Sequence, residues 1–279
     1  MLLGILAILC AGASALICVS AGAFESLCWL WALPVGFVGC FVLALGLLFL
    51  FVWVAAGLVD QEKPQEKDSP FYRKMAYFYI RLVLPVLQVK MHITGMEKVP
   101  REGRILLVSN HLNDMDPVVL LYFFRKKQIA FISKRENSTM FIVGKLMHKL
   151  MCQLINREND REALKTILKC VQLLKDDEVS VGVFPEGYTS LDGLLHPFRH
   201  GVFKIAQKAK VPIVVCTLRN TQYVFKNAMK LRPTDVYLDV VDVIPAEELA
   251  GVTAVDVGNR VHKLMADNLG PDLVLQQGE

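Results

Sequence analysis

The sequence lacks the cysteine spacings, basic runs and metal-ligand clusters that mark several common classes of protein. Its seven cysteines include no CxxC pair, so the spacing indicates neither a zinc knuckle nor a thioredoxin-type redox site. No basic run or ladder of aromatic and basic residues points to nucleic acid. His196 and His200 are four residues apart, but Pro197 and Gly201 argue against a helix that would pair them as metal ligands. We therefore expect reduced cysteines, no metal ion and no nucleic-acid partner.

Charge is almost absent from the first 59 residues, in which Glu25 is the only charged side chain. All 31 basic residues and 26 of the 27 acidic residues lie in residues 60–279, which therefore carry a net charge of +5. Such a mildly basic domain suits anionic headgroups and anionic substrates. A helix that spans a bilayer needs about 20 apolar residues. The uncharged stretches predict a transmembrane hairpin over residues 1–59, with spans at about 2–23 and 32–57.

A cleaved signal peptide is the alternative for this first segment. A signal peptide normally has a basic n-region and an apolar core of about 7–15 residues, whereas this segment has no basic residue and is longer. Basic residues do follow the second span, at Lys63, Lys67, Arg73, Lys74 and Arg81. By the positive-inside rule they predict a multi-pass protein of the cell membrane, with the remaining residues on the cytoplasmic side.

Residues 60–84 are predicted to form a polar linker followed by a helix. DQEKPQEKDSP is polar and contains two prolines, and FYRKMAYFYIRLVLPVL carries aromatic and basic residues at helical spacing. Two interpretations of this helix stay open. It either packs on the following domain or lies on the bilayer surface as an interfacial helix.

Residues 85–279 alternate between strand-like and helix-like segments. The clearest helix is DREALKTILKCVQLLKDD, whose apolar residues share one face behind a start at Asn159. RILLVS, VSVGVF and VPIVVCTL are apolar runs typical of buried strands, while VYLDVVDVI alternates as an edge strand does. The pattern predicts an α/β cytoplasmic domain with a mostly parallel central sheet flanked by helices.

Three polar segments come directly after predicted strands. NHLNDMDP follows RILLVS, FPEGYTS follows VSVGV, and INREND follows CQL. Functional sites in open α/β sheets gather beyond the carboxyl ends of the strands. We therefore expect these three segments to converge at one edge of the sheet.

The first segment places His111 and Asp116 in an H-x4-D spacing. If the chain turns there into a helix that Asp116 opens, with Pro117 at its first position, the carboxylate can fold back onto the imidazole. A carboxylate on one ring nitrogen fixes the tautomer, and the other nitrogen can then take a proton from an alcohol. The structural alternative is a polar turn with Asp116 only as a helix cap.

The other two segments offer groups that could hold a polar substrate. Glu186 can accept hydrogen bonds from a polyol, and Gly187 permits close approach of the backbone. Arg157 has a planar fork suited to phosphate, as does Arg199 in HPFRHG. The alternatives are an ordinary strand-to-loop turn and surface arginines.

Together these segments resemble the glycerolipid acyltransferases, the family of 1-acylglycerol-3-phosphate acyltransferase. NHLNDMD matches the N-H-x4-D motif of that family, and QLINR, FPEGYTS and VPIVV resemble its second, third and fourth blocks. All four occur in the family order over residues 110–215. Four blocks in order are far more specific than any one of them.

The resemblance implies a role for each motif. His111 is the general base and Asp116 orients it, so that a lysophospholipid hydroxyl attacks an acyl thioester directly. The acceptor's glycerol phosphate is held by the second and third blocks, and the fourth shapes the acyl site; the residues concerned are Arg157, Glu186, Gly187, Ser190 and Pro212. No cofactor is implied beyond acyl-CoA or acyl-carrier protein as co-substrate.

The third block departs from the family pattern. The family usually reads F-P-E-G-T-R-S, in which the arginine helps to bind phosphate, whereas Tyr188 and Thr189 occupy these two positions here. We hypothesise that Arg199 or Lys134 supplies the missing charge.

The sequence therefore predicts a membrane-bound O-acyltransferase that converts lysophosphatidate (1-acylglycerol 3-phosphate) into phosphatidate at the sn-2 hydroxyl. The altered third block leaves another lysophospholipid or polar lipid open as the acceptor. A non-catalytic lipid-binding protein is the alternative of a different class.

Overall fold

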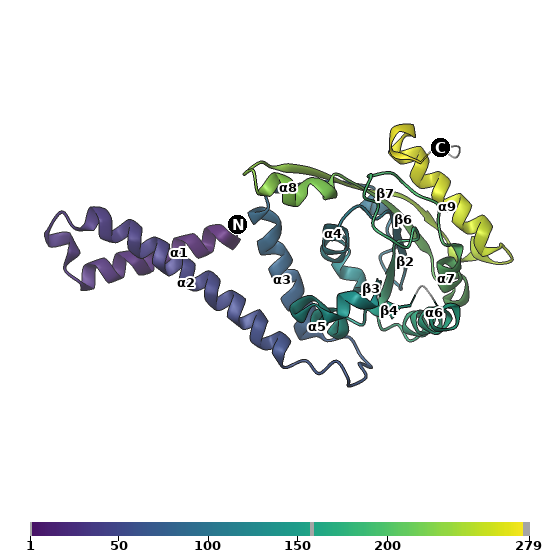
Figure 1. The fold of residues 1–279 in the computed structure, drawn as a ribbon, viewed down its shortest axis with the longest axis horizontal. Helices are drawn as coiled ribbons and strands as arrows, with labels where there is room; N and C mark the ends of the chain where they lie inside the picture. The colour runs from purple at the N-terminus through teal and green to yellow at the C-terminus, as the bar shows by residue number, and fades with distance from the viewer. Residues whose placement is uncertain (1, 157–158, 276–279) are drawn as a thin grey trace. The chain divides into compact units, whose positions relative to one another are not determined.

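The computed structural model describes residues 2–156 and 159–275. The chain forms two compact units, residues 1–60 and residues 61–279. The first unit is a pair of helices, α1 (Leu2–Ser20) and α2 (Trp29–Gly57), with a short 3-10 helix between them (Figure 1). The predicted helical hairpin is confirmed, although α1 ends and α2 begins earlier in the chain than the sequence indicates.

One close contact joins the two helices of the hairpin. The Ser14 hydroxyl donates a hydrogen bond to the Leu33 carbonyl at 2.8 Å. A Cβ atom at Gly36 would lie 2.5 Å from Ser14 Oγ, so glycine is needed for this approach. Both helices have the length and apolar composition of a membrane span.

The second unit is an α/β domain in which helices and strands alternate along the chain, as predicted. Asn159 caps the longest predicted helix by accepting a hydrogen bond from the Glu162 N–H at 3.1 Å. The elements in chain order are α3 (Pro70–Val86), β1 (Val89–Thr94), β2 (Leu106–Ser109), α4 (Met115–Phe123), β3 (Ile129–Lys134), α5 (Phe141–Lys149), β4 (Gln153–Ile155), α6 (Asp160–Lys175), β5 (Ser180–Val183), α7 (Lys204–Ala209), β6 (Ile213–Arg219), α8 (Val224–Ala228), β7 (Thr234–Ile244) and α9 (Ala254–Leu269).

Seven strands form one sheet in the order β1-β7-β6-β2-β5-β3-β4. Every neighbouring pair is parallel except β6 and β7, which are antiparallel. The expectation that β7 is an edge strand is wrong, because it pairs with β1 on one side and β6 on the other. Its alternation has another cause: Val236 and Leu238 are buried in the core, whereas Tyr237 between them is half-buried on the opposite face.

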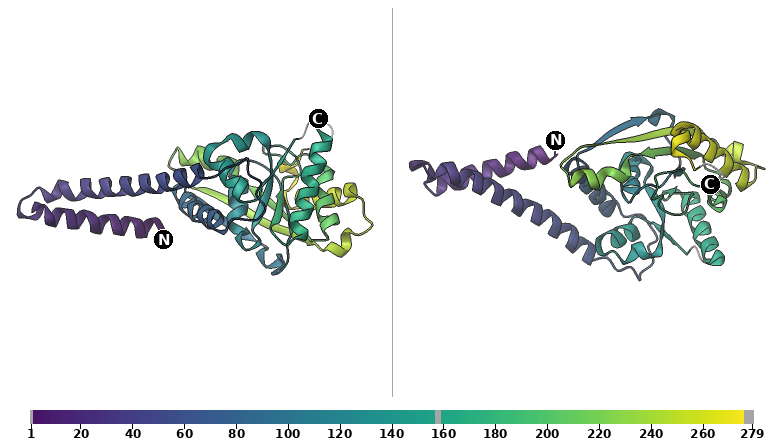
Figure 2. Two further views of the ribbon diagram at one scale, coloured as in Figure 1. Left: turned by 90° about the horizontal axis from the view of Figure 1, so that it is seen from below. Right: turned by 45° about the horizontal axis from the view of Figure 1, so that its top comes forward.

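Helices cover both faces of the sheet (Figures 1 and 2). Buried side chains of α6, α7 and α9 pack on one face, and those of α3, α4 and α8 pack on the other. The alternation within β2 serves both layers, since Leu106 packs with the first set and Leu107 with the second. A strand buried on both sides explains why this segment is a continuous apolar run.

Helix α3 packs one of its faces on this domain. Ile80 and Leu84 belong to the core beneath α4, and Arg73 is buried as well. The opposite side of the helix exposes Phe71 and Phe78. The packed interpretation of this helix therefore holds for one face, and contact of the other face with a bilayer stays a prediction.

The sheet topology brings two of the three polar segments, those after β2 and β5, to a common edge, while the third includes residues 157–158, which lie outside the described residues. Strands β2, β3, β4, β5 and β6 all run in the same direction, so their carboxyl ends share that edge. His111 follows β2, the Phe184–Ser190 segment follows β5, and Lys134 ends β3. Strands β1 and β7 run as a parallel pair in the reverse direction.

Candidate active site

The centre of this edge is a hydrogen bond between His111 Nδ1 and Asp116 Oδ2, with the two atoms 2.9 Å apart. The Asp116 side chain is fully buried, while the His111 side chain is 16% exposed. A carboxylate on Nδ1 holds a proton there and leaves Nε2 as the basic atom. Within the described ranges, Nε2 forms no hydrogen bond and is not one of the buried polar atoms without a partner, so it is accessible to a ligand.

The carboxylate of Asp116 is fixed by more than the histidine. Its Oδ2 atom also accepts the backbone N–H groups of Leu112 at 2.5 Å and Asn113 at 2.7 Å. Its Oδ1 atom accepts a hydrogen bond from the Thr221 hydroxyl. Four donors on one carboxylate fix its orientation.

The expected helix start requires a correction. Helix α4 begins at Met115 with Asp114 in the capping position, so Asp116 does not open the helix but lies within its first turn. The Asp114 side chain forms no capping hydrogen bond. Asp116 nevertheless performs a similar task, because its carboxylate turns back to accept the N–H groups that precede the helix.

An aromatic stack sets the plane of the imidazole. The ring of His111 lies on that of Phe184, with centroids 4.2 Å apart and an interplanar angle of 16°. Phe184 in turn stacks on Phe131 of β3, with centroids 5.5 Å apart. The plane of the histidine ring is therefore fixed by Phe184, which follows β5 and stacks on Phe131, and its edge is held by Asp116.

Glu186 is a buried carboxyl group that joins two parts of the site. It is 1% exposed and accepts the backbone N–H of His111 at 2.9 Å and that of His196 at 3.1 Å. Burial raises the pKa of Glu186 from its ordinary 4.5 to about 7, although the two N–H groups favour the charged form. The side chain thus connects the third block to the first through the backbone of the histidine itself.

Gly187 lies in the left-handed region, with φ of +83°, and packs against Arg199. A Cβ atom here would meet Arg199 Nε at 2.8 Å, so only glycine lets the guanidinium approach the turn. Arg199 is exposed, and its backbone N–H donates to the Pro185 carbonyl at 2.7 Å. The structure therefore brings Arg199 to the turn that lacks the family's usual arginine.

Ser190 is buried and organises the loop. Its backbone N–H donates to the His111 carbonyl at 2.7 Å. Its hydroxyl lies 2.7 Å from both Asp192 Oδ1 and the Leu194 carbonyl. These contacts fix Ser190 within the loop, and its contact with a substrate stays a prediction.

Of the remaining predicted residues that the structure describes, Lys134 lies at the same edge of the sheet as His111 and Pro212 lies at the opposite edge. Lys134 is exposed at the carboxyl end of β3, on the same edge as His111. Arg157 lies outside the described residues. Pro212 precedes β6, and its carbonyl accepts the N–H of Leu106 at the opposite end of β2. The structure therefore does not bring Pro212 to His111, and its role in an acyl site stays a prediction.

Two contributors to the site were missed by the sequence analysis. Thr221 is 105 positions from Asp116 in sequence, and no local pattern marks it. Asn110 pins β2 to β6 by accepting from the Leu218 N–H at 2.7 Å and donating to the Leu218 carbonyl at 2.9 Å. Asn110 does stand in the N-H-x4-D motif, and that position was the available signal.

The arrangement defines a class of site. A histidine oriented by a carboxylate faces outward, and among the described residues no serine or cysteine side chain is hydrogen-bonded to its ring. Such a pair is suited to activating the hydroxyl of a substrate rather than a nucleophile of the protein.

Comparison with known proteins finds similarity to acyltransferases. Residues 90–219 match the family model described as Acyltransferase. The chain is 28% identical over 175 residues to a 1-acyl-sn-glycerol-3-phosphate acyltransferase of Borreliella burgdorferi, covering 61% of this chain and 68% of the relative. It is 29% identical over 185 residues to a probable 1-acyl-sn-glycerol-3-phosphate acyltransferase of Mycoplasma pneumoniae, covering 64% and 68%.

A solved structure has the same fold. The crystal structure of a 1-acyl-sn-glycerophosphate acyltransferase from Thermotoga maritima superposes with a TM-score of 0.60 at 22% identity, covering 78% of this chain and 86% of that one. Residues 90–219 of this chain thus carry an acyltransferase domain, and the chain is an acyltransferase with the α/β fold of that structure.

Proposed function

We propose that the protein is a membrane-bound 1-acylglycerol-3-phosphate O-acyltransferase, which forms phosphatidate. The observation that carries the proposal is the His111–Asp116 pair, whose outward nitrogen stands at the edge where the polar segments meet. The names of the related proteins support the same acceptor.

The proposed reaction is a single transfer. His111 Nε2 takes the proton of the sn-2 hydroxyl as the hydroxyl oxygen attacks the thioester carbonyl carbon. The C–O bond forms, the C–S bond breaks, and the departing thiolate receives the proton from the imidazolium. Asp116 stabilises that imidazolium through Nδ1, and the step requires no metal because the base is the histidine.

Recognition of the acceptor's phosphate is assigned to basic groups beside the third block. Arg199 packs on Gly187, one position before Tyr188. Lys134 is the last residue of β3, at the same edge of the sheet. Arg157 is proposed to act with them, as the resemblance implies. A guanidinium offers two parallel donors to phosphate, which makes Arg199 the better candidate to replace the missing arginine.

Membrane attachment is assigned to the first unit. The helices α1 and α2 contain no basic residue, and basic residues follow α2 in the chain. This charge asymmetry favours residues 61–279 on the cytoplasmic side, where a lipid acceptor and a soluble acyl donor can both reach the domain.

A panel of acceptors and donors tests the proposal. Purified full-length protein in mixed micelles receives lysophosphatidate, another lysophospholipid or glycerol 3-phosphate, each with acyl-CoA and then with acyl-carrier protein, and products are followed by mass spectrometry. We expect phosphatidate to form fastest. If no acceptor consumes thioester, or lysophosphatidate is the poorest acceptor, the proposal is wrong.

A second acceptor class is favoured by one observation, the replacement of the family's arginine by Thr189 next to the exposed Tyr188. The variant Arg199→Gln separates the two cases. If Arg199 binds phosphate, the KM for lysophosphatidate should rise while a phosphate-free acceptor is unaffected. An equal effect on both acceptors would remove Arg199 from phosphate recognition.

A further inference from the structure

The connection between β6 and β7 exposes an unusual amount of apolar surface. This connection, residues 220–233, contains the 3-10 helix Thr221–Tyr223 and helix α8. Met229 and Leu231 are each 82% exposed, and Tyr223 and Phe225 are each 47% exposed. Four large apolar side chains on a 14-residue surface connection are more than an ordinary loop presents.

All charged residues of the same connection are basic. Its sequence NTQYVFKNAMKLRP contains Lys226, Lys230 and Arg232 and no acidic residue. All three basic residues are exposed and alternate with the exposed apolar residues. Apolar side chains interleaved with cations match a bilayer surface that carries anionic headgroups, because the chains enter the acyl boundary while the cations remain among the phosphates.

The tip of the connection is held in a restricted conformation. Leu231 has φ of +53°, in the left-handed region that non-glycine residues rarely occupy. The N–H groups of Leu231 and Arg232 are fixed by the carbonyls of Ala228 and Asn227, both at 2.9 Å. The turn therefore holds the Leu231 side chain in solvent in a strained conformation, and burial within the domain does not offset the cost of that strain.

The connection ends next to the C-terminal end of helix α3. The N–H of Thr234, where β7 begins, donates to the carbonyl of Gln88 just after α3, at 3.1 Å. Figures 1 and 2 show α8 beside α3 on the same side of the sheet. Helix α3 exposes Phe78 and Val86 together with the basic Arg81. The connection and helix α3 thus both expose apolar and cationic side chains on the same side of the sheet.

The buried end of the connection reaches the active site. Thr221 donates to the Asp116 carboxylate, and Val224 is fully buried in the core with α4. The exposed tip and the oriented carboxylate therefore belong to one short segment, whose inner part is fixed and whose outer part faces solvent.

We propose that residues 220–233 form a docking element that enters the surface of an anionic bilayer. Docking would hold the carboxylate end of the site close to the headgroups, where a lipid acceptor resides. The proposal rests on the proposed function only in requiring a membrane lipid as substrate, and it concerns a part of the chain outside the four family blocks.

The test uses full-length protein reconstituted in bilayers with lipids brominated in the acyl chains near the headgroup, which quench tryptophan on contact. The native tryptophans Trp29, Trp31 and Trp53, all in the first unit, are replaced by Phe. Met229→Trp then reports on the connection. Val255→Trp is the matched control, since Val255 is 50% exposed on α9 on the opposite layer.

We expect Met229→Trp to be quenched at least about twofold more than Val255→Trp in phosphatidylcholine bilayers containing phosphatidylglycerol. Quenching should fall when phosphatidylglycerol is omitted, or when Lys226, Lys230 and Arg232 are changed to Gln together. Circular dichroism checks the fold of each variant.

Equal quenching of the two reporters would overturn the proposal. Quenching that stays the same without phosphatidylglycerol and in the triple Gln variant would also overturn it. Protection of Met229→Trp from quenching together with cross-linking between copies would instead assign this surface to a second copy. Quenching does not depend on turnover. If the enzyme is active but Met229→Trp is not quenched, only the docking proposal is refuted. If Met229→Trp is quenched but the enzyme does not acylate lysophosphatidate, only the proposed acceptor is refuted.

Discussion

Two buried networks of charged and polar groups lie at opposite ends of the same sheet. They differ in whether every hydrogen-bonding group has a partner. At the carboxyl ends of the strands, Asp116 orients His111, and the outer ring nitrogen remains available. At the amino ends, Arg73 of α3 pairs with Asp68, and both side chains are at most 5% exposed. Both networks place charge inside the protein, so burial alone does not distinguish a catalytic group from a structural one.

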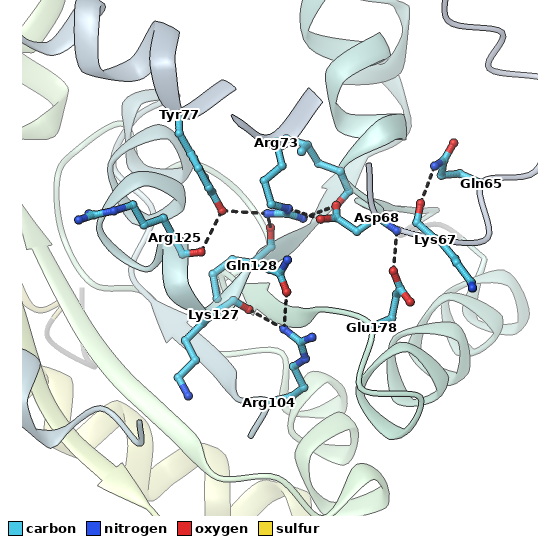
Figure 3. A network of polar contacts seen from close by, with 12 residues as sticks. Gln65, Lys67, Asp68, Arg73, Tyr77, Arg104, Arg125, Lys127, Gln128 and Glu178 are labelled. Atoms are coloured by element: carbon cyan, nitrogen blue, oxygen red, sulfur yellow. Dashed lines mark hydrogen bonds and ion pairs between the residues drawn. The ribbon is translucent and has the colours of Figure 1, made fainter. Parts of the chain in front are cut away.

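The network around Arg73 satisfies every donor of the guanidinium (Figure 3). Its five N–H groups reach both carboxylate oxygens of Asp68, the Tyr77 hydroxyl and the carbonyls of Ile129 and Leu150, at 2.6–3.3 Å. Such saturation ties α3 to β3 and to the end of α5 and leaves nothing to react. The open nitrogen of His111 is therefore the informative difference between the two ends of the sheet.

The largest effect is expected when the open end loses its base. His111→Ala should lower kcat by about 10²–10⁴-fold, since this is the usual contribution of a general base. Circular dichroism should be unchanged. His92→Ala is the control, because His92 also pairs with an aspartate, Asp235, at 2.8 Å, but on the exposed strand β1. Wild-type turnover in His111→Ala would show that the pair is not catalytic.

The next largest effect should appear at the saturated end, and in stability rather than turnover. Arg73→Met should lower the free energy of unfolding by about 3–5 kcal/mol, because it leaves the Asp68 charge buried without its partner. Urea unfolding in detergent, followed by circular dichroism, measures the change. Turnover per folded molecule should stay the same.

A matched ion pair on the surface serves as the comparison for Arg73. Arg260 contacts Glu248 at 2.7 Å, but the two side chains are 47% and 48% exposed. Arg260→Met should therefore cost less than about 1 kcal/mol. If both variants lose the same stability, burial is not the source of the effect at Arg73.

Much of the fold follows from the sequence because burial on both faces leaves a plain signature. Strands β2, β5 and β6 are short continuous apolar runs, and each was predicted. The position of β7 was not predictable in this way. Its alternating pattern reflects unequal cover of its two faces, and its insertion between β1 and β6 is a long-range pairing that leaves no local trace.

The site was predictable where chemistry depends on local spacing. The five-residue offset of His111 and Asp116 predicted their contact, since a tight turn brings these positions together. Thr221 and Phe184 lie in the segments that follow β6 and β5, so their contacts with Asp116 and His111 depend on the order of strands in the sheet. From the sequence, Arg199 was proposed only as a substitute charge. The structure adds that Arg199 packs against Gly187, and its role in binding phosphate stays a prediction.

A third prediction concerns the buried carboxyl group at the open end. Because the pKa of Glu186 is raised to about 7, the folded protein binds a proton there that the unfolded chain releases near 4.5. The stability contributed by this group is fully present below pH 4.5 and is lost as the pH rises through about 7. One pKa unit corresponds to about 1.4 kcal/mol, so the loss is at most about 3.5 kcal/mol.

Glu186→Gln isolates this contribution, since the amide resembles the protonated carboxyl group and does not titrate. Urea unfolding at a series of pH values should show the wild type losing stability relative to Glu186→Gln between pH 4.5 and 7. Parallel curves for the two proteins across this window would contradict the raised pKa.

The smallest effect should come from Thr221, which contacts Asp116 of the proposed catalytic pair but not His111. Thr221→Val keeps the shape of the side chain and removes the donor to Asp116 Oδ1. With one oxygen unpaired, the carboxylate is held less firmly, and we expect kcat to fall roughly tenfold, equivalent to about 1–2 kcal/mol, with KM for both substrates unchanged. Thr221→Ser should restore kcat because it returns the hydroxyl.

Thr217 provides the control that separates positioning from packing. It is buried on β6, whereas Thr221 is buried just after that strand, and the Thr217 hydroxyl donates to Asn268 of α9 at 2.6 Å, on the other face of the sheet. Thr217→Val should lose similar stability and keep its kcat. If both valine variants slow turnover equally, or if Thr221→Ser fails to restore it, the loss reflects general loosening of β6 rather than orientation of Asp116. A selective loss at Thr221 would show that the open end of the sheet depends on a contact supplied from beyond the family motifs.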